Sequence, residues 1–187
     1  MIIKAIKNRC SVRSYKPEKI REEELQEILE AARMAPSGSN IRKTRIFVIQ
    51  KEETLKEIAK VVALATKAGH ADGISKERAA AIDPETHNFF YHAPTLLIMT
   101  SPEDSYNAYV DAACVIENAM LQATELNIGT CWVNNVRRTQ KDEGVRAFLR
   151  NIGVRDDEIV IGCVAVGYPA GEMKPKEQTE GHEVIRV

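Results

Sequence analysis

Residues 107–126 read NAYVDAACVIENAMLQATEL, a stretch long enough for about five turns of α-helix and rich in alanine. Its apolar residues, among them Val110, Cys114, Ile116 and Met120, fall on more than one side of that helix. A helix that is apolar on several sides is expected to be covered on several sides. We therefore expect residues 107–126 to form the most buried helix of the fold.

Apolar runs on either side of this helix predict a buried sheet. Residues 95–100 read TLLIMT and residues 159–167 read IVIGCVAVG, and such continuous runs are typical of strands buried on both faces. Two further strands are predicted over residues 45–50 and 130–134. Helical spacing of apolar residues predicts four more helices, over residues 2–8, 22–35, 52–69 and 141–150.

The alternation of helices and strands indicates an α/β or α+β class with one sheet. A length of 187 residues fits a single domain spanning residues 1–187. Residues 70–92 contain glycines, a proline and mixed charges, and we expect a mobile excursion there with some helix, including residues 85–91. The tail after Pro169 is polar and has no period, so we expect it to dock elsewhere or to stay disordered.

Composition and charge exclude several classes of protein. With 26 basic and 27 acidic residues, the net charge of −1 gives no global drive toward nucleic acid or anionic membranes. No apolar run reaches the roughly 18 residues of a membrane span, and the N-terminus is too charged for a secretory signal. The four cysteines are scattered without a C-x-x-C pair, which indicates free thiols and no metal site. We expect a cytoplasmic protein with no membrane or nucleic-acid partner.

The common motifs of side-chain catalysis are missing from the sequence. It contains no G-x-S-x-G, no H-E-x-x-H, no P-loop lysine motif and no G-x-G-x-x-G. This pattern fits either a binding protein or an enzyme whose cofactor carries the reaction.

The segment Arg9-Cys10-Ser11-Val12-Arg13 is the first candidate binding site. Arginine forks match phosphate oxygens, and serine adds a neutral donor. In an extended chain Arg9, Ser11 and Arg13 point the same way, so the three side chains can meet one anion. The alternative is a solvated basic face beside a helix.

Three other segments have an ordinary structural explanation when each is taken alone. Residues 35–40 (APSGSN) are typical of a helix stop, or of a small-residue loop that lets the backbone approach a planar ligand. Residues 126–132 (LNIGTCW) are typical of a helix end followed by a core aromatic. Gly167-Tyr168-Pro169 and Lys174-Pro175-Lys176 are typical of a solvated tail.

Taken together, these segments resemble the nitroreductase family of flavoproteins. The family pattern R-R-S-x-R stands here as residues 9–13, and A-P-S-x-x-N stands as residues 35–40. The segment His92-Ala93-Pro94, the helix that runs into residues 129–132, and the ending at residues 167–176 follow in the family's order. The resemblance implies an α+β, three-layer fold with a central, mostly antiparallel sheet flanked by helices. It also implies a homodimer with FMN at the interface and a C-terminal extension swapped onto the partner subunit.

By the same resemblance, Arg9, Ser11 and Arg13 would hold the FMN phosphate and ribityl chain, with Lys174 or Lys176 completing the charge. The loop from Pro36 to Asn40 of the other subunit would line the isoalloxazine ring, and the backbone from Gly129 to Trp132 would meet its edge. The full predicted set is Arg9, Cys10, Ser11, Arg13, Pro36, Ser37, Ser39, Asn40, Arg42, Gly129, Thr130, Cys131, Trp132, Lys174 and Lys176. No catalytic acid or base and no metal ligand is expected.

The activity implied is that of an FMN-dependent NAD(P)H oxidoreductase. NADH or NADPH would leave a hydride on flavin N5 and depart, and a small organic acceptor such as a nitroaromatic or a quinone would then take it, in a ping-pong cycle. The alternative is an FMN-binding storage or redox-sensing protein without turnover. A flavin-cutting or dehalogenating relative on the same scaffold and a nucleic-acid binder are less favoured.

This sequence departs from the family pattern at several positions. Cys10 replaces the second arginine, and residues 40–44 read NIRKT where the family commonly has N-x-Q-P-W. Arg42 and Lys43 indicate a preference for a negatively charged acceptor. Asn127 stands where a glycine is frequent. The aromatic residues 89–91 are expected to pack the predicted helix into the dimer, with stacking on an acceptor as the alternative.

Overall fold

The computed structural model describes residues 2–175 and 182–187. Within these ranges, one antiparallel sheet runs in the order β1-β2-β4-β3. Its strands are β1 (Arg45–Ile49), β2 (Thr95–Pro102), β3 (Gly129–Val133) and β4 (Glu158–Gly167). All four predicted strands are confirmed to within two residues at their ends.

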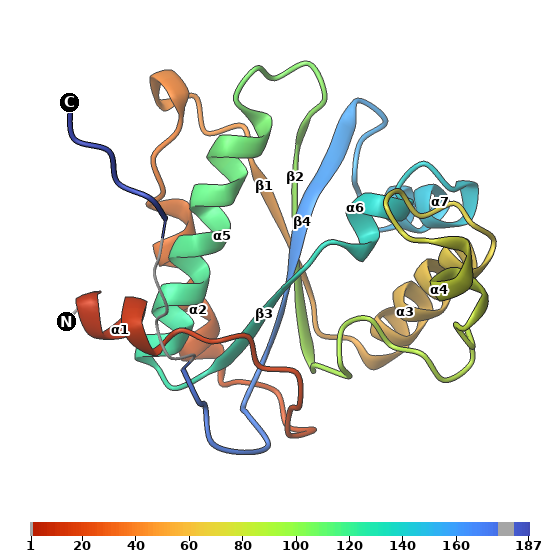
Figure 1. Cartoon of the computed structure of the whole chain (residues 1–187), viewed down its shortest axis with the longest axis horizontal. Helices are drawn as coiled ribbons and strands as arrows, with labels where there is room; N and C mark the ends of the chain where they lie inside the picture. The colour runs from red at the N-terminus through yellow and green to blue at the C-terminus, as the bar shows by residue number, and fades with distance from the viewer. Residues whose placement is uncertain (1, 176–181) are drawn as a thin grey trace.

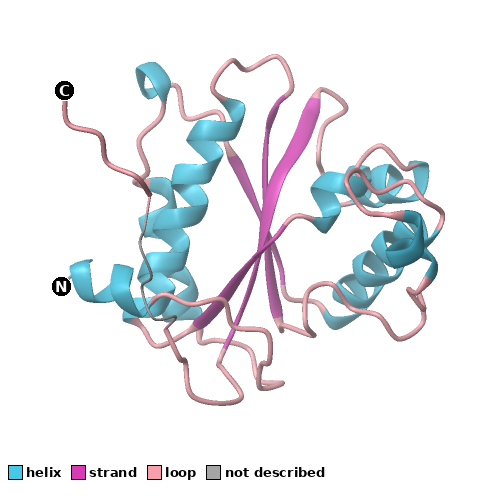
Figure 2. Cartoon of the chain, viewed as in Figure 1, coloured by secondary structure: helices cyan, strands magenta, loops and turns pink. Residues whose placement is uncertain are grey.

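Helices cover both faces of this sheet (Figures 1 and 2). On one face lie α1 (Ile2–Asn8), α2 (Glu22–Arg33) and α5 (Ala108–Glu125). On the other lie α3 (Glu52–Lys67), α4 (Lys76–Ala80), α6 (Asn135–Thr139) and α7 (Glu143–Asn151). The predicted α+β fold, with a central antiparallel sheet between helical layers, is confirmed.

The core lies on both sides of β2. Because successive side chains of a strand point to opposite faces, Leu96 and Ile98 pack toward α3 and α7, whereas Leu97 and Met99 pack toward Ile116 of α5. All four of these β2 side chains are fully buried. The continuous apolar run thus forms a strand buried on both faces, as predicted.

The α5 helix packs against the sheet on one side and against α2 and α1 on others. Ala112 and Ile116 are fully buried against the sheet, as expected for the central helix. Cover on several sides is thus confirmed for most of the helix, whereas Val110 in its first turn is 60% exposed. The helix ends where Asn127 adopts a left-handed φ of 58°, a conformation that asparagine tolerates better than most residues.

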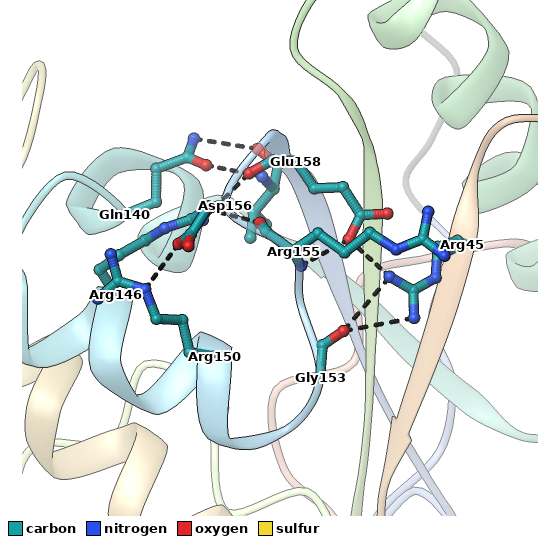
Figure 3. A network of polar contacts seen from close by, with 9 residues as sticks. Arg45, Gln140, Arg146, Arg150, Gly153, Arg155, Asp156 and Glu158 are labelled. Atoms are coloured by element: carbon teal, nitrogen blue, oxygen red, sulfur yellow. Dashed lines mark hydrogen bonds and ion pairs between the residues drawn. The ribbon is translucent and has the colours of Figure 1, made fainter.

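A polar network fixes the start of β4 (Figure 3). The Glu158 carboxylate, 1% exposed, lies 2.6 Å from Nη1 of Arg45 on β1 and accepts a hydrogen bond from the Arg155 backbone N–H. The Gln140 amide, between α6 and α7, donates to the Val160 carbonyl and accepts from the Val160 N–H. Gln140 thus supplies hydrogen-bond partners for the backbone of β4 at a position where β3 does not pair with it.

Residues 70–92 differ from the prediction. The expected helix over residues 85–91 is wrong, because these residues form turns. The Asn88 side chain accepts a hydrogen bond from the Phe90 N–H, and Tyr91 and His92 have left-handed φ angles of 58° and 56°. Some helix is present in the excursion as α4, but its position was not predicted, and neither was α6, since five residues are too few to show a period. Among the described residues, no helix is both long and apolar enough to cross a membrane.

Candidate functional site

The segment from Arg9 to Arg13 runs alongside β3. Ser11 forms a parallel bridge with Thr130, and the Val12 N–H donates to the Thr130 carbonyl at 2.8 Å. A β-carbon at Gly129 would lie 2.8 Å from Cγ1 of Val12, so the segment approaches the strand as closely as a glycine allows. The structure therefore brings two of the predicted groups, residues 9–13 and residues 129–131, into contact.

The predicted donors of this segment surround the Cys131 thiol. Burial raises the pKa of Cys131, while the charge of Arg13, a hydrogen bond from Ser11 and the charge of Arg9 act in the opposite direction. Ser11 and Arg13 are exposed and Arg9 is half-buried. Among the described residues, neither arginine pairs with a carboxylate, so both charges remain available near Cys131. Such a donor set fits a phosphate group.

Thr130 adds an unpaired polar atom to this region. Its Oγ1 is buried and has no hydrogen-bond partner within the described ranges. Because successive side chains of a strand point to opposite faces, Thr130 faces the α5 side of the sheet, whereas Cys131 faces the α3 side. Cys10 is half-buried beside Ser11. Trp132, at 36% exposure, donates from Nε1 to the Asn134 side chain and is the least enclosed of the predicted β3 residues.

Two tyrosines that were not predicted hold the segment in place. The Tyr15 hydroxyl donates to the Val12 carbonyl at 2.7 Å, and burial raises the pKa of Tyr15. The Arg13 guanidinium carbon lies 5.8 Å from the centre of the Tyr91 ring. The spacing of Tyr15 after Arg13 indicates a shared side of an extended chain. No local pattern marks Tyr91, because its contact with Arg13 is tertiary.

The loop from Pro36 to Arg42 lies elsewhere. The Gly38 N–H donates to Asp111 in the first turn of α5 at 3.0 Å, and Arg42 donates from Nε to the Asn40 side chain at 2.8 Å. Ser39, Asn40 and Arg42 have left-handed φ angles between 51° and 56°. A cavity of about 590 Å³ opens beside this loop. Its lining includes Pro36, Ser37 and Arg42.

The α5 helix separates the two groups of predicted residues. The loop of residues 36–42 contacts the start of α5, whereas residues 9–13 contact β3 just beyond its end (Figure 1). At 1.5 Å per residue, its 18 residues span roughly 27 Å. One chain therefore does not bring both groups to one ligand.

The predicted C-terminal lysines have different outcomes. Lys174 is exposed and lies 4.0 Å from the Glu172 carboxylate. The chain up to Pro175 borders a cavity of about 400 Å³ together with Asn8 and Asn127, close to the start of the N-terminal segment. Lys176 lies outside the described residues.

A separate cavity of about 680 Å³ opens between α6, α7 and the start of β4. Its lining has four basic and four acidic side chains, so it offers no net charge to a ligand. The basic residues are Arg137, Arg138, Lys141 and Arg146, and the acidic ones are Asp72, Glu103, Asp156 and Glu158. The N-terminal segment beside β3 is therefore the stronger candidate for an anion site.

Comparison with known proteins gives consistent matches over most of the chain. A family model described as the nitroreductase family matches residues 6–168. A protein of Archaeoglobus fulgidus named "Putative NADH dehydrogenase/NAD(P)H nitroreductase" is 26% identical over 171 residues, which cover 91% of this chain and 86% of the relative. Two solved nitroreductases with bound FMN match 100% of this chain and 97% of their own. The protein from Bacteroides fragilis is 36% identical with a TM-score of 0.88, and that from Desulfitobacterium hafniense is 26% identical with a TM-score of 0.84.

Proposed function

Because this chain belongs to the nitroreductase family, we propose that it passes a hydride from NADH or NADPH through bound FMN to a small organic acceptor. The predicted enzyme class, an FMN-dependent NAD(P)H oxidoreductase, agrees with the name of the archaeal relative and with the FMN bound in both solved structures. The nitroaromatic or quinone acceptor and the ping-pong order are part of the proposal. The observation that carries it is the meeting of Arg9, Ser11 and Arg13 beside the Gly129–Cys131 edge of β3.

These residues fit the phosphate end of FMN. Two guanidinium groups without carboxylate partners among the described residues and one hydroxyl supply donors beside Cys131. We assign Arg9, Ser11 and Arg13 to the phosphate and the ribityl chain. When bound, FMN supplies the centre that accepts and releases the hydride, so the protein needs no side-chain acid or base of its own.

The predicted flavin ring contacts require a second copy of the chain. The loop of residues 36–42 is too far from residues 9–13 to share a ligand with them, so we propose a homodimer in which each site takes this loop from the partner. Tyr109 and Val110, both more than half exposed at the start of α5, are apolar side chains suited to such an interface. Val184, Ile185 and Val187 are exposed in the last described segment, which supports the swapped C-terminal extension. A single domain over residues 1–187 and a cytoplasmic location complete the proposal.

An anaerobic visible spectrum of the FMN-supplemented protein tests this function. Bleaching of the bound flavin by NADH or NADPH is expected and identifies the donor. Reoxidation by nitroaromatics and quinones then shows which acceptor class is used. Bound flavin that stays oxidised with both donors would overturn the oxidoreductase proposal in favour of storage or redox sensing. A protein that binds no flavin would contradict both.

A further inference from the structure

Tyr91 has a backbone conformation that the surrounding structure must maintain. Its φ is 58°, and that of the next residue, His92, is 56°. Side chains with a β-carbon adopt this left-handed region at a cost, and two in succession are uncommon. Unfavourable backbone of this kind is often kept where a side chain has to be aimed.

The contacts around Tyr91 hold that conformation. The Asn88 side chain accepts from the Phe90 N–H at 2.8 Å, and the Asn88 carbonyl accepts from the Tyr91 N–H at 3.2 Å. Phe90 is only 2% exposed and belongs to the core cluster on the α3 side of the sheet. The hydrogen bonds to Asn88 and the burial of Phe90 therefore fix the backbone of this turn. The fixed backbone limits where the Tyr91 ring can lie.

The ring is aimed at Arg13. The guanidinium carbon of Arg13 lies 5.8 Å from the ring centre, within the range of a cation–π contact. Hydrogen bonding to the Tyr91 side chain is also the main cause that raises the pKa of Arg13. Among the described residues, this guanidinium contacts the Tyr91 ring and, at 3.5 Å, the Ser11 carbonyl.

A neutral aromatic partner suits an anion site. A carboxylate would orient Arg13 as well, but it would cancel the charge that the phosphate needs. A phenol ring orients the guanidinium and leaves its charge available. An arginine that is already placed also loses less side-chain freedom when its ligand binds.

We propose that Tyr91 is a positioning residue for Arg13, which it holds in the orientation that receives the phosphate of FMN. The inference rests on the proposed function, because it concerns the same site. The proposal also gives residues 70–92 a role in cofactor affinity, because the turn that carries Tyr91 contacts Arg13 in the N-terminal segment.

Comparison of FMN with riboflavin, which lacks the phosphate, tests the proposal. Affinities are measured by quenching of flavin fluorescence for the wild type, Tyr91→Leu and Tyr91→Asn, since asparagine tolerates the left-handed backbone and keeps the turn folded. Loss of the ring is expected to raise the FMN Kd about threefold to tenfold and to leave the riboflavin Kd unchanged. Phe89→Leu, in the same turn but without a contact to Arg13, is the control and is expected to leave the FMN-to-riboflavin ratio unchanged.

A double-mutant cycle gives the second readout. In an Arg13→Gln background, Tyr91→Asn is expected to have no further effect on FMN affinity, because the residue it positions is gone. An equal loss for FMN and riboflavin, an unchanged FMN Kd, or additive effects in the cycle would overturn the positioning role. A wild type that binds neither flavin would instead overturn the proposed function, so the two failures are distinguishable.

Discussion

Val12 and Gly129 lie so close that a β-carbon at position 129 would come within 2.9 Å of Val12 Cβ as well as 2.8 Å of its Cγ1. Valine is branched at its β-carbon and has few rotamers with which to avoid such a clash. The position of the N-terminal donor segment on β3 therefore depends on the missing side chain at Gly129.

Gly129→Ala is expected to displace that segment. Overpacking of this kind costs about 1–3 kcal/mol of unfolding free energy, and displaced arginines should raise the FMN Kd by about tenfold or more. Urea unfolding and flavin titration measure the two effects. Gly171→Ala is the control, because a β-carbon there meets nothing within 4 Å and should change neither quantity. A Gly129→Ala protein with wild-type FMN affinity would show that the segment does not contribute to the site.

The free energy of unfolding is expected to depend on pH through the protonation of Glu24. Hydrogen bonding, mainly from Arg21 and also from the Tyr168 hydroxyl, lowers the pKa of this carboxyl from 4.5 to about 2. A lowered pKa in the folded state stabilises the protein above pH 4.5, and the contribution disappears as the pH falls toward 2.

Glu24→Gln is therefore expected to be less stable than the wild type by roughly 1–2 kcal/mol at pH 7, since Arg21 is largely exposed and water screens the pair. Urea unfolding between pH 7 and pH 3 should show that difference shrinking as the pH falls. Glu22→Gln removes an exposed carboxylate from the same helical turn and serves as the control. A difference that stays constant over this range would contradict the assignment.

The ion pair between Arg45 and Glu158 is expected to respond unequally to loss of its two partners. Arg45→Met leaves the Glu158 carboxylate buried with one backbone donor, and uncompensated buried charges cost about 3–5 kcal/mol. Glu158→Gln leaves Arg45, which is 37% exposed and can turn to water, so a smaller loss is expected. Urea unfolding of both variants compares them. Equal losses would mean that water reaches Glu158.

The loop residue Arg42 is expected to influence which acceptor is used. Its guanidinium donates a hydrogen bond to the Asn40 side chain, which holds the positive charge at the edge of the 590 Å³ cavity. Arg42→Glu should lower kcat/KM for 4-nitrobenzoate relative to nitrobenzene by about threefold to tenfold, with a smaller effect in high salt. Arg78→Glu, on α4, controls for the change in net charge. An unchanged ratio of the two substrates would count against an anionic acceptor.

The long periodic elements were predictable from the sequence because their pattern is local. The apolar run of β2 and the alanine-rich α5 each contain enough residues to show a period or its absence. The turn around Tyr91 was not predictable in this way, since it depends on the Asn88 side chain and on a core contact of Phe90. The aromatic sequence of residues 89–91 is equally compatible with a helix.

In the candidate site, too, local groupings could be predicted from the sequence and tertiary contacts could not. The grouping of Arg9, Ser11 and Arg13 could be predicted from spacing, because residues two apart in an extended chain share a side. Their neighbours Tyr91 and Thr130 come from segments about 80 and 120 positions away in sequence, and only the packed fold brings them together. The place of the loop at residues 36–42, at the far end of α5, likewise depends on how α2 packs against α5.

The distance between these two groups leads to a test of the proposed dimer. Arg9→Gln/Arg13→Gln removes the phosphate donors from one chain. Gly38→Val forces the loop or the Asn107 side chain to move, because a β-carbon at position 38 would lie 2.0 Å from Nδ2 and 3.1 Å from Cγ of Asn107. Each variant by itself is expected to lose most flavin-dependent activity, since both of its sites are defective.

Co-expression of the two variants under different affinity tags should restore activity if each site combines the N-terminal segment of one chain with the loop of its partner. In a mixed dimer, one site then carries both defects and the other carries none. Random pairing makes half of the dimers mixed, so the recovered activity should be about a quarter of the wild-type value. Purification through both tags in succession should raise it to about a half. If each chain builds its site alone, both sites of a mixed dimer are defective and no activity returns, because neither chain then has donors and loop together.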